Sequence, residues 1–422
     1  MKVLIKQATI ISSSSPFNGQ KKDILITDGI ITSIADSIKD NAATIIEKDS
    51  LCASIGWVDV FSNFNDPGLE YKETIETGAK AAAAGGFTDV FVAPNTNPAI
   101  DTKAQVEYIL QKAKQTAINI HPIGAVTKNT DGKELAEMYD MKESGAAAFS
   151  DGSNAVQNAG LLLKALQYVK AFNGTVIQLP DDKSIAANGL MNEGIVSTQL
   201  GLPGKPAMAE ELIIARDLKL TKYADSKIHF TGVSTAKSLE YINRAKQNGT
   251  AVTCSVTSYH LFFCDEDLKD YNTNLKVNPP LRTKADRDAL IAAVINGTVD
   301  CIASHHWPQN KDNKDCEFEY AKNGMIGLET LFGALFSIVN GQLSVDKLVE
   351  LLSVSPRKIF NLPVPEIKEE EMACLTLFNP HTEYIFEAAM IKSKSTNSPF
   401  IGKKLKGKVL GIINGIKTEW NG

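Results

Sequence analysis

The central part of the chain alternates short apolar runs with longer amphipathic stretches. From about residue 55, runs typical of buried strands are separated by segments such as "TKAQVEYILQKAKQ", in which apolar residues recur at helical spacing. Strands that alternate with helices in this way predict an α/β fold, a (β/α)8 barrel. The predicted strands are Trp57–Phe61, Thr88–Ala93, Asn119–Val126, Ala146–Ser150, Thr175–Leu179, Lys227–Gly232, Ala251–Val256 and Val299–Ser304.

Both ends of the chain have a different pattern from the middle. The first 54 residues read as short strands with turns, and the pair Asp28-Gly29 between two apolar runs is typical of a hairpin. After an expected helical segment at 343–361, strand-like runs return as "CLTLFNP", "EYIF" and "GKVLGIINGIKTEW". We therefore expect residues 1–54 and 364–422 to form one small composite β domain beside a barrel of residues 55–363.

Composition excludes several classes of protein. The chain has 422 residues, of which 43% are apolar and 22% charged, as in ordinary globular proteins. A net charge of -5 and a pI near 5.8 argue against a nucleic-acid or anionic-membrane binder, and the apolar runs are too short or Gly-broken for a membrane span. The N-terminus lacks a signal-peptide cleavage site, and the six scattered cysteines favour reduced thiols over disulfides. We expect a cytoplasmic protein.

The segment after the first barrel strand has little reactive chemistry. "DVFSNFNDPG", residues 59–68, follows an apolar run at the position where barrel enzymes place catalytic residues. Apart from one Asp at each end, it contains no group that binds a metal tightly or transfers a proton near neutral pH.

Several ordered blocks nevertheless resemble one family of barrel enzymes. The chain is similar to the class I dihydroorotases of the amidohydrolase superfamily over essentially its whole length. The resemblance implies a metal-dependent barrel with a composite β domain that opens or closes a cyclic amide in pyrimidine synthesis. The blocks are "APNTNPAID" (93–101), "AAFSDGSNAV" (147–156), "GLMNEGIVSTQLGLPGKPAMAEELIIARD" (189–217), "VSTAKSLEYI" (233–242), "KVNPPLRTKADRDALI" (276–291), "GLETLFGALFS" (327–337) and "SPFIGKKLKGKV" near the C-terminus.

The chain departs from the family pattern at the first strand. Active members end this strand in D-x-H-x-H-x-R-x-P-G, whose two histidines point the same way on a strand and can hold one zinc ion. Here Phe61 and Asn63 stand in the histidine places. Asn65 replaces the arginine that would bind the substrate carboxylate.

Further departures follow at the other strand ends. By the resemblance, Gln178 and Gly232 stand where the family has metal-binding histidines. His305 occupies the place of the aspartate that binds metal and acts as general base, and Gln309 the place of a substrate-facing histidine. Of the metal set, only Asp151 matches.

These residue types predict that the barrel mouth holds no catalytic metal. A hydrolytic zinc needs about three protein ligands and an open position to activate water. We therefore expect no catalytic residue and no cofactor, or zinc if a rebuilt site exists. Asn95 and Asn278 match substrate-side asparagines of the family and are either a remnant ligand site or structural turn residues.

The adjacent pair His305-His306 has two interpretations. One is a rebuilt metal site with Asp151; the other, which we favour, is one histidine packed at the barrel mouth and the other in solvent. Adjacent strand residues face opposite sides, so convergence on one ion needs an irregular turn. His229, on the sixth strand, is expected to be a structural, hydrogen-bonded imidazole.

Three functions stay open from the sequence. The first is a non-catalytic dihydroorotase-like protein that acts as a structural or regulatory partner of aspartate carbamoyltransferase; this partner comes from the resemblance, since the family contains such assemblies. The second is a dihydroorotase or other cyclic-amide hydrolase with an altered metal site. The third is a binder of a small cyclic ureide through the remaining asparagines. We also expect a homo-oligomer.

Overall fold

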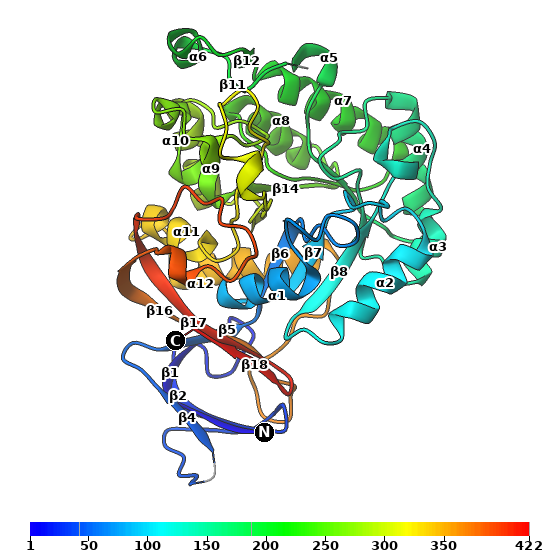
Figure 1. Ribbon diagram of the computed structural model, residues 1–422. Helices are drawn as coiled ribbons and strands as arrows, with labels where there is room; N and C mark the ends of the chain where they lie inside the picture. The colour runs from blue at the N-terminus through cyan, green and yellow to red at the C-terminus, as the bar shows by residue number, and fades with distance from the viewer. Residues whose placement is uncertain (42, 187, 422) are drawn as a thin grey trace.

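A barrel of parallel strands forms the centre of the molecule (Figure 1). The computed structural model describes residues 1–41, 43–186 and 188–421. The strand order is β15-β14-β13-β10-β9-β8-β7-β6, and all eight predicted barrel strands are confirmed. Their bounds are β6 (Trp57–Ser62), β7 (Phe87–Val92), β8 (Asn119–Gly124), β9 (Ala148–Phe149), β10 (Val176–Gln178), β13 (Ile228–Phe230), β14 (Val252–Thr257) and β15 (Cys301–Ala303).

Helices cover the outside of the barrel, and several begin at a residue whose side chain caps the first turn. Thr235, before α8, accepts the backbone N–H of Ser238, and Thr283, before α10, accepts that of Asp286. The helices are α1 (Ile75–Ala84), α2 (Lys103–Ala113), α3 (Met138–Glu143), α4 (Ala159–Lys170), α5 (Lys183–Ala186), α6 (Ile195–Leu200), α7 (Met208–Ala224), α8 (Ala236–Gln247), α9 (Ser258–Phe262), α10 (Lys284–Asn296), α11 (Leu331–Val339), α12 (Val345–Val349) and α13 (Ser355–Ile359). No helix among the described residues is long and apolar enough to cross a membrane.

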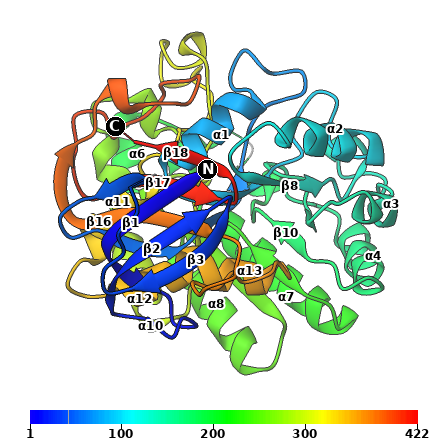
Figure 2. The same ribbon diagram turned by 90° about the horizontal axis from the view of Figure 1, so that it is seen from below.

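A second sheet combines strands from both ends of the chain, as the sequence predicts. Figure 2 shows the N-terminal strands beside the C-terminal ones, and the order is β18-β17-β16-β5-β1-β2-β3, with β4 paired to β1. The bounds are β1 (Lys2–Ile11), β2 (Lys21–Thr27), β3 (Ile30–Ala35), β4 (Thr44–Glu47), β5 (Cys52–Ile55), β16 (Cys374–Ile385), β17 (Lys404–Asn414) and β18 (Lys417–Trp420); β11 (Met191–Asn192) and β12 (Gly204–Lys205) form a separate pair. The residue limits expected for the domains stay a prediction.

One strand boundary in the sequence analysis is wrong. The runs "CLTLFNP" and "EYIF" belong to a single strand, β16, because its pairing with β17 resumes at Glu383 after an irregularity that follows Asn379. Pro380 lies in this irregular stretch and has no N–H for the ladder, which accounts for the break. All six cysteines are free thiols, as expected.

A buried carboxylate joins the first and last strands of the barrel. Asp59, on β6, accepts the backbone N–H of Ser304 at 2.6 Å and its hydroxyl at 2.7 Å, just beyond β15. The Ser62 hydroxyl donates to the same carboxylate at 2.5 Å, and Ser62 forms a parallel bridge with His306. Burial raises the pKa of Asp59 to about 6, and these hydrogen bonds oppose that rise. The seam of the barrel is therefore held by the Asp59 carboxylate together with this bridge.

We predict that Asp59→Ala lowers the free energy of unfolding by about 3 kcal/mol, because a buried N–H and two hydroxyls lose their acceptor. Urea denaturation followed by circular dichroism measures the change. Asp36→Ala is the matched control, since Asp36 pairs with Lys22 at the surface, and it should leave the stability nearly unchanged. Equal effects of the two substitutions would contradict a special role for Asp59.

Candidate functional site at the barrel mouth

The space at the mouth of the barrel is filled by two rings. Phe61 points inward from β6, and its ring centroid lies 4.9 Å from that of the His305 imidazole. His305 follows β15 with φ 43°, a left-handed turn that a non-glycine residue adopts rarely. Its Nε2 lies 2.8 Å from the Thr231 hydroxyl, and the side chain is buried. Burial lowers the pKa of His305 to about 3, so the imidazole is neutral near pH 7.

Gly232 leaves room for that imidazole. A Cβ atom added at Gly232 would lie 2.5 Å from Cε1 of His305, closer than real Cβ atoms approach other atoms. Gly232 also has φ 69°, in the left-handed region that favours glycine. A larger side chain at position 232 therefore cannot coexist with the ring of His305 as it stands.

Asp151, after β9, has both of its oxygens engaged. Oδ1 accepts the backbone N–H of Thr127 at 2.8 Å, and Oδ2 accepts the Thr127 hydroxyl at 2.5 Å. Burial raises the pKa of Asp151 to about 6. Asn95 fastens the same loop, since its amide donates to the Asp151 carbonyl and its oxygen accepts the N–H of Ser153. Asn95 therefore holds the backbone of the loop at Asp151 and Ser153 in place.

Gln178 and Asn63, which the resemblance aligns with metal-binding histidines, are bonded within the fold. The Gln178 amide donates to Asp217 at 3.0 Å, and its oxygen accepts the N–H of Val156 at 3.3 Å. The Asn63 amide donates to the carbonyl of His306 at 3.3 Å. Both side chains are buried.

His306 turns away from His305. Its Nε2 lies 3.2 Å from Glu73, and its Nδ1 accepts the backbone N–H of Gly327 at 3.2 Å. The expectation that one of the two histidines lies in solvent is wrong, because both are buried and His306 is shielded completely. The two rings have separate partners, so they do not converge on one ion.

Of the two positions that the resemblance aligns with substrate-binding residues, Gln309 is bonded internally and, within the described part of the chain, the Asn65 amide nitrogen is not. Gln309 donates to the carbonyl of Asn323 at 2.8 Å and accepts from Asn313 at 3.0 Å. Asn65 is buried with φ 58°, and its amide nitrogen has no hydrogen-bond partner among the described residues. Neither side chain presents a cation to a carboxylate.

A chain of polar groups runs through the barrel interior below the mouth. The His229 imidazole contacts Thr253 at 2.9 Å and Ser255 at 3.2 Å, and Ser255 contacts Thr231 at 3.0 Å, which leads to His305. This confirms a structural, hydrogen-bonded His229. The sequence analysis does not predict the other polar groups of this network. Residues two apart on a strand face the same side, so polar residues at such spacing on neighbouring strands could have indicated it.

Asn278 lies beside a hollow of about 370 Å³ at the same end of the barrel. Its oxygen accepts from the ammonium group of Lys205 at 2.7 Å, and Lys205 also pairs with Asp181 at 2.6 Å. The sequence analysis does not single out Lys205, because its strand, β12, has only two residues and gives no periodic signal. Oδ1 of Asp181 is buried without a partner among the described residues. The hollow is lined by these groups and not by Phe61 or His305.

The donor groups at the mouth do not fit a hydrolytic zinc. Zinc in proteins takes imidazole, thiolate or carboxylate ligands. The positions that the resemblance aligns with the family's ligands hold two internally bonded amides, a phenyl ring and a glycine, and the Asp151 carboxylate is held by Thr127. Among the described residues, no group of three or more His, Cys, Asp or Glu side chains is arranged to hold a metal ion.

Comparison with known proteins gives consistent matches along the sequence. A family model described as "Dihydro-orotase-like" matches residues 53–238. A protein named dihydroorotase from Citrifermentans bemidjiense is 41% identical over 416 residues, 98% of each chain. One of the same name from Acetivibrio thermocellus is 41% identical over 417 residues, again 98% of each.

Solved structures agree in fold. The L-hydantoinase (dihydropyrimidinase) from Arthrobacter aurescens superposes with a TM-score of 0.83 at 23% identity, covering 99% of this chain and 95% of that one. The dihydropyrimidinase from Brevibacillus agri gives 0.81 at 20% identity, with the same coverage. At these identities the likeness supports the amidohydrolase-type barrel and its added β domain.

We predict that His305 makes folding stability depend on pH. Below about pH 6.5 His305 is protonated in the unfolded chain, whereas in the folded chain, where its pKa is about 3, it stays neutral. The contribution of His305 to folding stability is therefore complete above pH 6.5 and is lost as the pH falls towards 3. His305→Gln can still bond Thr231 but cannot titrate. Between pH 6 and 5 the variant should lose about 1 kcal/mol less unfolding free energy than the unmodified protein.

Urea denaturation at both pH values measures the difference. His381→Gln is the control, since His381 is exposed, and it should follow the unmodified protein. Parallel pH dependence of His305→Gln and the unmodified protein would show that His305 is protonated in the folded state.

Proposed function

The chain belongs to the dihydroorotase family, and on that premise we propose that it is a non-catalytic protein. In this proposal it acts in pyrimidine biosynthesis as a structural or regulatory partner of aspartate carbamoyltransferase. The observation that carries the non-catalytic part is the composition of the barrel mouth. By the resemblance, Phe61, Asn63, Gln178 and Gly232 stand in the family's metal-binding places, and His305 stands in place of the aspartate base. The choice of partner rests on the family resemblance.

The packing of the mouth supports this proposal. Water activation by zinc lowers the pKa of water from 15.7 to about 7, and this requires ligands that these residues cannot supply. The ring of His305 fills the space next to Gly232, and Phe61 stacks on it. Two family features that would orient a substrate, an arginine and a histidine, are replaced by Asn65 and Gln309.

A second function has support of a different kind. The relatives at 41% identity are named dihydroorotase, which favours a dihydroorotase or other cyclic-amide hydrolase with an altered metal site over a non-catalytic protein. Such a site would have to use Asp151 and His305, after both had left their present partners Thr127 and Thr231. The residue types at the mouth favour the first function, and the names favour the second.

We predict that the protein, dialysed after purification, carries well under one equivalent of zinc and hydrolyses dihydroorotate no faster than buffer. The reason is the lack of imidazole ligands at positions 61, 63, 178 and 232. Metal analysis and a continuous absorbance assay measure the two quantities. Stoichiometric zinc that is lost in Asp151→Asn, together with a rate that disappears in the same variant, would establish the second function.

Restoring the ligands provides the complementary measurement. The fivefold variant Phe61→His, Asn63→His, Gln178→His, Gly232→His and His305→Asp removes the ring that opposes a side chain at position 232. Even with zinc bound, its turnover should stay several orders of magnitude below that of an active homologue, because Asn65 and Gln309 still leave the substrate unoriented. Near-normal turnover would show that the rest of the site is ready for catalysis.

We further predict that the purified chain forms a complex with the aspartate carbamoyltransferase of its own cell. Size-exclusion chromatography with light scattering of the two proteins, separately and mixed, measures the complex and also tests the expected homo-oligomer. Since the proposed role does not depend on the mouth, His305→Gln should bind as well as the unmodified protein. Separate elution at micromolar concentrations would overturn the partner while leaving the lack of catalysis as a separate question.

A further inference from the structure

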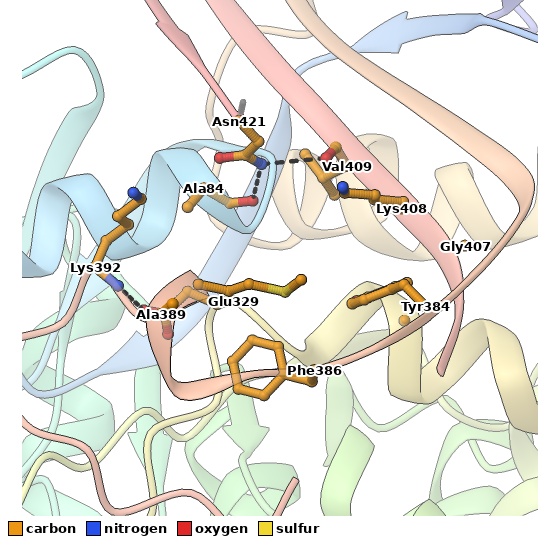
Figure 3. A pocket seen from close by; sticks show the side chains of 12 residues that line it. Ala84, Glu329, Tyr384, Phe386, Ala389, Lys392, Gly407, Lys408, Val409 and Asn421 are labelled. Carbon is orange, nitrogen blue, oxygen red and sulfur yellow. Dashed lines mark hydrogen bonds between the residues drawn. The ribbon is translucent and has the colours of Figure 1, made fainter. Parts of the chain in front are cut away.

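A second hollow, of about 250 Å³, lies away from the mouth residues, where the C-terminal strands meet the barrel helices (Figure 3). Its walls come from the end of α1, the start of α11, strands β16 and β17, and the short turn Ala388–Met390. None of the residues discussed at the barrel mouth lines it. Its properties are therefore independent of the proposed function.

One side of the hollow is apolar and contains aromatic rings. Phe386, Met390 and Val409 line it, together with the ring of Tyr384. Burial raises the pKa of Tyr384 to about 12, so its phenol stays protonated. Among the described residues, the phenol has no hydrogen-bond partner. A ligand thus meets a flat apolar surface with one available O–H group.

Two glycines keep the hollow open. A Cβ atom at Gly333 would lie 2.6 Å from the Tyr384 hydroxyl, and one at Gly407 would lie 2.9 Å from Cε1 of Phe332. Gly407 also has φ 89°, which disfavours any other residue there. Both positions line the hollow, so neither strand nor helix supplies a side chain that would fill it.

The rim of the hollow is positively charged. Lys392 and Lys408 line it, and neither ammonium group has a hydrogen-bond or carboxylate partner among the described residues. They belong to residues 388–418, which contain seven lysines and lie between Glu387 and Glu419, in a chain whose net charge is -5; one of the seven, Lys404, pairs with Glu383. Such clustering creates a local positive potential that attracts anions.

One carboxylate also lines the hollow. Glu329 accepts the backbone N–H groups of Lys392 and Ser393 through its Oε1, at 2.9 and 3.0 Å. These two donors reduce its repulsion of an anion. Opposite it, the Asn421 amide donates to the carbonyl of Ala84 at 2.7 Å and to that of Val409 at 3.2 Å, which fixes another wall (Figure 3).

We propose that this hollow binds a small anion with a flat apolar ring, of the size of an aromatic carboxylate. The ring packs on Phe386 and Met390, and the anionic group lies near Lys392 and Lys408. The Tyr384 phenol donates a hydrogen bond to an oxygen of the ligand. The volume suits a ligand of this kind, since sites for small molecules combine apolar walls with a few polar groups.

Benzoate is the probe that tests the proposal, with benzamide as the uncharged analogue and acetate as the anion without a ring. Saturation-transfer NMR on the full-length protein should give a Kd for benzoate of about 1 mM, as expected for nine heavy atoms. Benzamide and acetate should each bind at least about fivefold more weakly, because each lacks one half of the recognition.

Matched variants locate the site. Lys408→Gln should weaken benzoate at least about threefold, whereas Lys406→Gln, two residues away on the same strand and outside the lining, should not. Ala389→Trp should block the hollow, and Ala388→Trp, its exposed neighbour outside the lining, should leave binding unchanged. Absence of saturable binding, equal binding of acetate, or equal effects within either pair of variants would overturn the proposal.

Discussion

The fold depends on how the barrel closes. The seven junctions between neighbouring strands from β6 to β15 are formed by backbone hydrogen bonds. The seam between β6 and β15 is held instead by the carboxylate of Asp59 and by one bridge between Ser62 and His306. The contacts of this seam hold Ser62, at the end of β6, and Ser304, after β15, in place. Ser304 is held by Asp59, and the next residue, His305, has φ 43° and places its ring 4.9 Å from that of Phe61. The closure of the barrel and the packing of its mouth therefore involve consecutive residues.

The side chains at the mouth form part of the core. The Phe61 ring adds apolar area there, which is stabilising when buried. A neutral imidazole opposite a glycine fills the remaining space and keeps one hydrogen bond, to Thr231. The resulting arrangement is satisfied internally, so the binding of a metal ion there would require the disruption of several contacts at once.

The sequence predicts the repeated elements well and the individual partners poorly. Eight barrel strands could be located because each is a short apolar run between helical patterns, and the two-ended β domain because both ends share a strand rhythm. The burial of His306 could not be predicted, since it depends on Glu73, 233 residues away in sequence. The contact of Lys205 with Asn278 spans 73 residues and likewise leaves no local pattern. The family resemblance indicates which positions belong to the site, and only the structure shows how the side chains at those positions pack.

The sheet made from both chain ends has a consequence for synthesis on the ribosome. β5 lies between β1 and β16, and β16 begins only at Cys374. The first strands therefore leave the ribosome long before their neighbour exists, and the edge of β5 stays open while the barrel is being made. An open strand edge whose residues are buried in the finished fold is prone to pair with other chains. Pairing of β16 with β5 therefore closes this edge only late in translation, and a chain truncated before β16 leaves it unpaired and prone to aggregate.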